Sequence, residues 1–217
     1  MQQEVFQKEK IYKYFSILLI LSFFISCNKE QVQLPKSDKT ILKDIKDHSP
    51  VYMFFRVNEK DTIIKVNRQN TISSTNWVYN IDKRLPLRLV IPEIIKLQEK
   101  KKNSSHKKEG AIDVFSYADS IGNNLAFLPF TEMEFELVNN KRKQSVVVND
   151  TLSFVFNEKT YNWASFKSLV KELTADQLTN LELGFDEQTS YNDFIVVLTK
   201  LKKETEIDFV KIYVFRK

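Results

Sequence analysis

The fold class is set by residues 163–173, WASFKSLVKEL, in which apolar side chains recur at helical spacing opposite charged ones. A β-rich run at residues 151–156 precedes this helix, and a short strand at residues 181–186 follows it. A second amphipathic helix begins at Tyr191, and a strand over residues 208–215 comes last. The order β-α-β-α-β, with short connections, predicts a small mixed sheet that carries both helices on one face.

The same part of the chain resembles the periplasmic domain of the ExbD/TolR family. The resemblance is carried by residues 181–194, LELGFDEQTSYNDF, and by the strand that ends the chain. In that family an acidic residue ends a strand and a Tyr-Gly-type pair opens the next helix. Asp186 and Tyr191 occupy these places, whereas Asn192 replaces the glycine and Gly184 stands where many members carry a charge.

The resemblance implies a soluble binding domain whose sheet edge pairs with an extended peptide of a partner, or with a second copy. The family's motor action needs an acidic residue in a transmembrane helix, and residues 14–27 contain no Asp or Glu. The motor role is therefore not carried over. We expect the final strand to be an exposed edge, with Lys211, Ile212 and Tyr213 contacting the partner.

The start of the chain has the layout of a secretory signal peptide. Three lysines precede a hydrophobic segment, residues 15–27, which ends at Cys27, the single cysteine. The last four residues of this segment, FISC, resemble a bacterial lipobox. We expect residues 1–26 to be removed and Cys27 to receive lipid, including palmitate. A transmembrane helix would need about 20 apolar residues; a single-pass span and a buried core helix remain the alternatives.

The residues that follow Cys27 indicate where the protein resides. Residues 28–31, NKEQ, resemble the acidic tags that direct some lipoproteins to the outer face of the outer membrane. We therefore expect an outer-membrane lipoprotein and leave open whether it faces the periplasm or the surface. Residues 27–50 are polar and lack a sustained period, which predicts a flexible tether with a short helix around residues 40–47.

Residues 51–144 predict a first α+β module, and residues 145–217 a second. Two β-rich runs, at residues 51–57 and 61–66, indicate a hairpin. A helix is expected to begin at Pro92. This module is either a degenerate copy of the second or unrelated to it. Together the two modules predict an α+β protein built of two small mixed sheets with helices packed on one face.

Composition supports a packed, exported chain. With 42% hydrophobic and 12% aromatic residues, a core can form, and a single cysteine excludes an intramolecular disulfide. The net charge of +5 is spread among residues of both signs, so nucleic acid is not an expected partner.

Few residues suggest catalysis. The chain has three glycines, no glycine-rich phosphate loop and a sole thiol that lipid would consume. Glu132, Glu134 and Glu136 alternate along one strand, which indicates an exposed sheet face. His48 and His106 have no neighbouring ligands, so no metal site is expected. We expect no enzyme activity and no cofactor.

Two functions remain. The first is a lipid-anchored adaptor that binds an envelope protein, or itself, through a sheet edge in a transport or motor assembly. The alternative is a lipoprotein that binds cell-wall or surface glycan through the basic loop Lys100–Lys108 and exposed Tyr or Trp side chains. That loop is otherwise explained as a solvated connector.

Overall fold

The computed structural model describes residues 30–106, 108–142, 145–150, 153–174, 177, 181–205, 207 and 210–216. The expected signal peptide and Cys27 lie outside the described residues. Among the described helices, none is long and apolar enough to cross a membrane.

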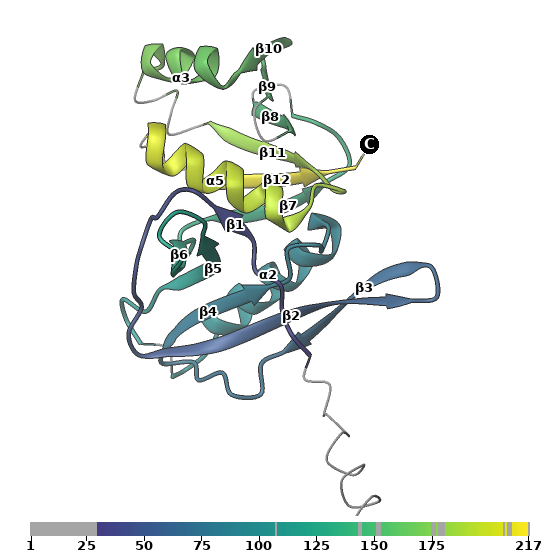
Figure 1. Ribbon diagram of the computed structural model, residues 1–217, viewed down its shortest axis with the longest axis vertical. Helices are drawn as coiled ribbons and strands as arrows, with labels where there is room; N and C mark the ends of the chain where they lie inside the picture. Colours follow the sequence, from purple (N-terminus) through teal and green to yellow (C-terminus); the bar gives the residue numbers. More distant parts are fainter. Residues whose placement is uncertain are drawn as a thin grey trace, which may run out of the picture. The chain divides into compact units, whose positions relative to one another are not determined.

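The first of two mixed sheets comes from the N-terminal half and confirms the α+β class (Figure 1). Its strands follow the order β1-β5-β4-β2-β3, with β6 paired to β5. The helix α2 (Leu87–Lys102) connects β4 to β5. The strands are β1 (Lys36–Ser37), β2 (His48–Asn58), β3 (Asp61–Asn67), β4 (Asn76–Ile81), β5 (Asp113–Asp119) and β6 (Leu125–Pro129).

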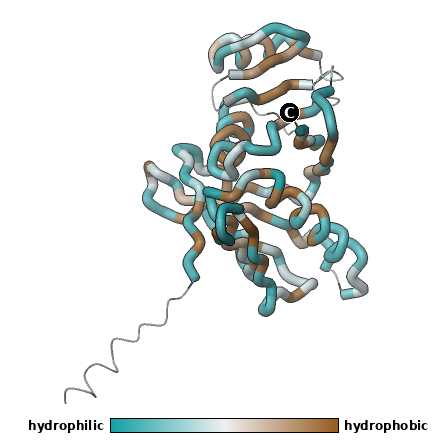
Figure 2. Tube along the Cα trace, turned by 90° about the vertical axis from the view of Figure 1, so that its right-hand side faces the viewer, coloured by the Kyte–Doolittle hydropathy of each residue, from teal (hydrophilic) through white to brown (hydrophobic). Residues whose placement is uncertain are grey.

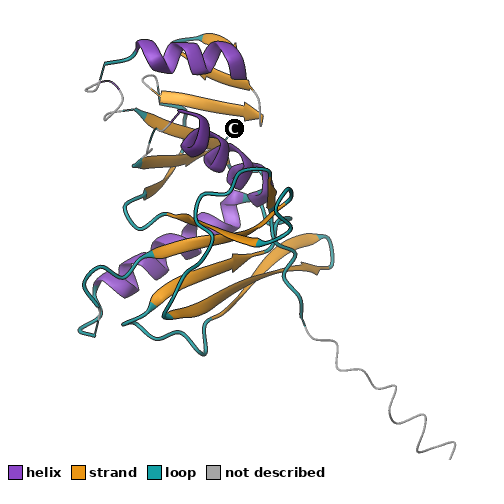
Figure 3. Cartoon of the chain, turned by 60° about the vertical axis from the view of Figure 1, so that its left-hand side comes forward, coloured by secondary structure: helices purple, strands orange, loops and turns teal. Residues whose placement is uncertain are grey.

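The second sheet has the strand order β10-β9-β8-β11-β12-β7 and carries the helices α3 (Trp163–Glu172) and α5 (Tyr191–Thr205). Its strands are β7 (Glu134–Val138), β8 (Ser145–Asp150), β9 (Ser153–Phe156), β10 (Lys159–Asn162), β11 (Glu182–Asp186) and β12 (Lys211–Phe215). The predicted elements are present as β9, α3, β11, α5 and β12, with a further strand, β10, between β9 and α3 (Figure 1). Figure 3 shows helices lying beside strands in this part of the molecule.

A single hydrophobic core joins the two sheets. Phe115 of β5 stacks on Phe130 with ring centroids 3.7 Å apart. The same ring meets Tyr191 and Phe194 of α5 edge-on, at 5.9 and 6.1 Å. The central strands β4, β5, β11 and β12 are buried along most of their length, and Figure 2 shows hydrophobic stretches along the tube of the folded part. The two expected modules are therefore halves of one packed unit.

The boundary between the halves differs from the one expected at residue 144. β7 lies before that boundary, yet it pairs in parallel with β12 of the second sheet. The stretch expected to be a flexible tether also differs, because β1 pairs with β5 and Leu42 forms a bridge with Phe127. Residues 40–47 contain no helix. From Val32 onward, this stretch belongs to the folded unit.

The prediction that a helix begins at Pro92 is wrong. α2 begins at Leu87, directly after an extended Pro86, and Pro92 lies inside it. The first backbone N–H groups of a helix lack partners within the helix. Here the N–H of Leu87 donates to the carbonyl of Thr189, which lies before α5. An acceptor about one hundred residues away along the chain thus fixes where α2 begins.

The two halves repeat one topology. The order β3-β2-β4-β5-β1 corresponds to β9-β8-β11-β12-β7, with an antiparallel hairpin at one end and parallel pairs elsewhere. Both α2 and α5 connect neighbouring parallel strands. Without a gap, α2 matches α5 at positions 104 residues later, as with Leu87 and Tyr191. The buried positions Leu87, Val90, Ile91, Ile94 and Leu97 correspond to Tyr191, Phe194, Ile195, Leu198 and Leu201.

The turns before these two helices meet in a seam with approximate twofold symmetry. The N–H of Leu87 donates to Thr189 O at 3.0 Å, and the N–H of Tyr191 donates to Leu85 O at 2.8 Å. The next pair repeats the exchange: Arg88 N–H donates to Glu187 O, and Asn192 N–H donates to Lys83 O. The first half is therefore a repeat of the second in topology, the alternative that the sequence left open.

Candidate partner-binding surface

The three residues expected to form a partner-binding edge lie in an interior strand. β12, which holds Lys211, Ile212 and Tyr213, pairs with β11 on one side and β7 on the other. Ile212 and Tyr213 are buried, and only Lys211 is exposed. The prediction of an exposed final strand is wrong because β7 covers its outer side. A strand bonded on both sides cannot accept a further one.

Tyr213 instead packs across its own sheet. A Cβ atom at Gly184 would lie 2.3 Å from the Tyr213 ring, so the glycine makes room for that ring. The Tyr213 hydroxyl contacts the Ser145 hydroxyl, and the Arg142 guanidinium lies 5.2 Å from the ring centroid. This packing explains why a glycine is needed at position 184.

A hollow of about 260 Å³ beside Tyr213 is lined by charges of both signs. Arg142 bridges Glu136, at 2.5 Å, and Glu182, at 2.8 Å. Glu134 also lines the hollow, and like Glu136 it is exposed, as expected. Three carboxylates and two cations line the hollow, and Arg142 already pairs with two of those carboxylates, so the net charge that could select a ligand is small.

The expected basic loop is only partly a surface feature. Lys101 belongs to the last turn of α2 and is buried, with its Nζ 2.5 Å from Asp113 Oδ1. Burial raises the pKa of Asp113, and the hydrogen bond from Lys101 partly offsets that rise. Lys108 pairs with Asp47 at 3.2 Å. The loop therefore does not present a continuous cationic patch.

The two tryptophans and His48 give little support to sugar or metal binding, whereas the Tyr52 ring is exposed. Trp77 is buried beneath Lys101, and Trp163 donates its Nε1–H to Glu204. His48 Nδ1 lies 3.0 Å from the carbonyl of Ile45. Among the described residues, no group of three side chains is arranged to hold a metal ion.

One strand does offer an open edge. β3 pairs with β2 alone, and of the described strands paired on one side only it is the longest, with seven residues. The pair Asn58–Asp61 closes the hairpin, which makes it a hydrogen-bonded pair. Hydrogen-bonded and non-hydrogen-bonded pairs alternate along antiparallel strands, so the backbone N–H and C=O groups of Thr62, Ile64 and Val66 point away from β2. Among the strands that the structure describes, none beyond β2 pairs with β3 (Figure 1).

A groove runs beside this edge, with α2 as its second wall. It consists of two adjoining hollows of about 240 and 600 Å³. Four cations line it, from both β3 and α2, against a single carboxylate, that of Glu93, which lies 3.6 Å from Lys96. We call this the β3 groove; its cations are Lys65, Arg68, Lys96 and Lys100, and its apolar lining is Val66 and Leu97.

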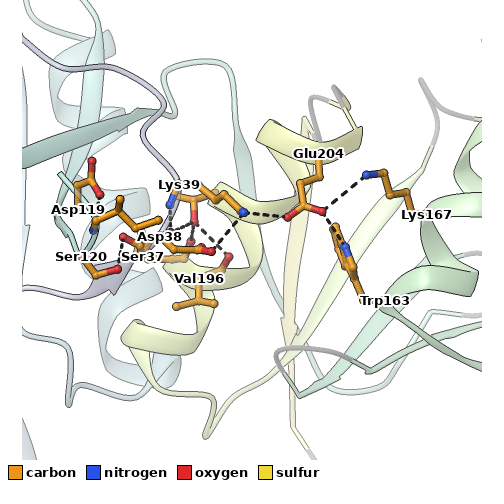
Figure 4. Close-up of polar contacts among 12 residues, drawn as sticks. Ser37, Asp38, Lys39, Asp119, Ser120, Trp163, Lys167, Val196 and Glu204 are labelled. Carbon is orange, nitrogen blue, oxygen red and sulfur yellow. Dashed lines mark hydrogen bonds and ion pairs between the residues drawn. The ribbon is translucent and has the colours of Figure 1, made fainter.

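The equivalent edge of the second sheet is covered. β10 pairs antiparallel with β9, and α3 follows it and lies against α5. Trp163, the first residue of α3, donates to Glu204 at 2.9 Å (Figure 4). The Lys200 ammonium lies 4.5 Å from the centroid of the same ring. In the 104-residue repeat, Lys200 and Glu204 correspond to Lys96 and Lys100. The β3 groove thus lies where β10 and α3 lie in the other half.

Glu204 shows how the covered edge is held. Burial would raise the pKa of its carboxyl, but hydrogen bonds from Trp163 and Lys39 hold that pKa below its usual range. Lys167 of α3 lies 3.7 Å away on the other side (Figure 4). An ionised carboxylate therefore ties α3 to α5, and in the first half a lysine occupies its place.

The β3 groove was not predicted from the sequence, although a signal for it exists. The connection between β3 and β4 is residues 68–75, whereas that between β9 and β11 is residues 157–181. Aligning the halves at Asp82 and Asp186 would have exposed this difference. In comparisons with known proteins, no family model, curated protein or solved structure matches the chain.

Proposed function

We propose that the protein is a lipid-anchored envelope lipoprotein that serves as a non-catalytic adaptor. It binds an extended segment of a partner protein by β-strand addition at the free edge of β3. The open edge beside the β3 groove carries this proposal, because the corresponding edge of the second sheet is completed by a strand. The membrane contact is lipid on Cys27, and the compartment is the outer membrane.

The free edge of β3 has the two features that stabilise an added strand. Backbone hydrogen bonds supply affinity, and pockets beside the strand select side chains. Thr62, Ile64 and Val66 turn their backbone groups outward, and the β3 groove lies beside them. Two copies that paired edge to edge would bring their cationic grooves together. A different protein is therefore favoured over self-association.

The test is photo-crosslinking in intact cells. A photoreactive residue replaces Thr62 at the β3 edge or, as the matched control, Thr160 in the outermost strand of the other sheet. We expect a discrete envelope protein to be crosslinked from position 62 and not from position 160. Ile64→Pro removes an outward N–H without disturbing the ladder to β2, so it should abolish this product.

Two results would contradict the adaptor. One is the same set of products from positions 62 and 160, and the other is a product that survives Ile64→Pro. The control is circular dichroism of the Ile64→Pro protein. An unchanged spectrum and melting temperature would show that the product is lost because the β3 edge no longer pairs, and not because the protein unfolds.

Anchoring is tested separately. In cells fed a clickable palmitate analogue, the protein should become labelled and should be recovered with outer-membrane fractions. The Cys27→Ala protein should be neither labelled nor recovered there. Label retained on the Cys27→Ala protein would contradict lipidation at this residue, whatever the fate of the adaptor function.

The alternative is a lipoprotein that binds an acidic cell-wall or surface glycan. The four cations of the β3 groove are the observation that favours it. Binding to an anionic polymer weakens steeply as ionic strength rises. It would also persist in the Ile64→Pro protein, because it needs no backbone pairing. Affinity measured against salt with both proteins separates the two functions.

A further inference from the structure

The covered edge of the second sheet shows what occupies such a position in this fold. β10 supplies a short antiparallel strand, and Asn162 then caps α3 by accepting a hydrogen bond from the Ser165 N–H. Phe166 of α3 stacks on Phe154 of β9 at 4.3 Å. The occupant is thus an extended segment that leads into a helix, with aromatic side chains at the junction.

The first half contains the matching receptor positions. In the paired registers, Val66 of β3 corresponds to Phe154 of β9, and Leu97 corresponds to Leu201. Lys96 corresponds to Lys200, whose ammonium lies above the Trp163 ring. The smaller side chain at Val66 leaves a hollow of about 240 Å³, lined also by Lys96 and Leu97. That hollow lies where an aromatic ring lies in the second half.

The charge at this place is reversed between the halves. Glu204 receives the indole N–H of Trp163 and the ammonium of Lys167. Its counterpart is Lys100. A carboxylate on the bound segment, at the position that Lys167 takes in the second half, would pair with this cation. Arg68 and Lys96 add to the positive side, and Glu93 is the one carboxylate among the residues that line the two hollows. Opposite charges favour association of a strand with such a groove, and like charges disfavour it.

We propose that the β3 groove binds an acidic, aromatic-bearing segment of a partner protein. The segment lies antiparallel to β3, places an aromatic ring in the hollow over Lys96 and directs a carboxylate to Lys100. This inference rests on strand addition at β3, the proposed function, and adds the chemistry of the partner.

A second copy of this chain does not supply that chemistry. Its own strand-and-helix segment, residues 159–172, contains three lysines and one glutamate. Inserted into the β3 groove, that segment would place cations against Lys96 and Lys100. A partner with the same shape and the opposite charge fits instead.

The experiment uses two fluorescent peptides and the full chain in detergent. The first peptide is residues 159–172 as they stand, and the second carries Lys159→Glu, Lys167→Glu and Lys171→Glu. Fluorescence anisotropy should show the acidic peptide binding at least about tenfold more tightly. Replacing its tryptophan by alanine should weaken binding several-fold.

Variants of the protein locate the binding. The double change Lys96→Glu and Lys100→Glu should remove the preference for the acidic peptide. Lys203→Glu, at an exposed position in the last turns of α5, is the matched control and should leave that preference intact. Ile64→Pro should weaken binding of the acidic peptide.

The outcomes separate the two proposals. If both peptides bind equally and Ile64→Pro removes both, strand addition stands and the acidic chemistry is wrong. If the acidic peptide binds equally well to the Ile64→Pro protein, strand addition at β3 is wrong as well. If the Lys96→Glu, Lys100→Glu protein still binds the acidic peptide more tightly than the native one, the β3 groove is not the site and the inference is overturned.

Discussion

The two halves of the molecule share a strand order and a crossover helix, but they complete their outer edges differently. In the second half, β10 and α3 cover the edge of β9. In the first half, residues 68–75 return directly to β4, and β3 stays uncovered. The common framework fixes the core, and the connection between two strands decides whether an edge is closed or open for binding. The difference between the halves therefore indicates where a partner docks.

The largest effect is expected from removing the ring that closes the second edge. Phe166 is fully buried and stacks on Phe154, so Phe166→Ala should lower the free energy of unfolding by about 3–5 kcal/mol. Urea unfolding followed by circular dichroism measures this loss. A loss under about 1 kcal/mol would show that α3 is only loosely attached, and the contrast between the halves would then fail.

The next effect concerns a pair of positions that the halves fill in opposite ways. Gly184 lies beside the Tyr213 ring, whereas their counterparts Asn80 and Ser116 are joined by a 2.8 Å hydrogen bond. Gly184→Ala should cost about 1–3 kcal/mol, because the added Cβ forces the ring to move. Asn80→Ala should cost about 1 kcal/mol. Equal costs from urea unfolding would contradict this complementary packing.

A smaller, pH-dependent effect is expected at Asp82, which directly follows β4 and is the counterpart of Asp186. Burial would raise the pKa of Asp82, but hydrogen bonds from Arg84 and from backbone N–H groups lower it below its ordinary value. The stabilisation is therefore complete above that ordinary value and is lost as pH falls through the lowered one. Asp82→Asn should cost about 1 kcal/mol near neutral pH. Its unfolding free energy should also depend less on acidity, as measured by urea titrations at several pH values.

The smallest effect compares two equivalent lysines. Lys200 lies over the Trp163 ring, so Lys200→Ala should lower the unfolding free energy by about 0.5–1 kcal/mol. Lys96 has no ring above it within the described residues, and Lys96→Ala should change stability by less than about 0.5 kcal/mol. Thermal unfolding of both variants checks this. A larger loss from Lys96→Ala would mean that this lysine already has a stabilising role in the free protein.

Local patterns in the sequence predicted the α+β class, the β2–β3 hairpin and the elements β9, α3, β11, α5 and β12, but not β10. They failed where distant segments decide the outcome. Nothing near Ile212 signals that β7 will pair beside it, and nothing near Lys36 signals that β1 will join β5. Likewise, the choice between Pro86 and Pro92 as the start of α2 depends on the carbonyl of Thr189.

The β3 groove was missed for a related reason. Its cations come from separate elements, with Arg68 after a strand and Lys96 on a helix, and only pairing of the halves brings them together. The sequence placed Lys100 in a basic loop that was interpreted either as an anion-binding surface or as a solvated connector. It could not show that Lys101, the next residue, is buried against Asp113.

The seam between the halves also bears on how the chain folds. The first turn of α2 is completed by carbonyls of residues 187 and 189, and the first turn of α5 by carbonyls of residues 83 and 85. Neither half can finish its crossover helix without the other, so the unit should unfold in one cooperative transition and refold slowly, as chains with many distant contacts do. Synthesis must therefore pass residue 189 before the first turn of α2 finds its acceptors, although the first sheet is complete in sequence long before.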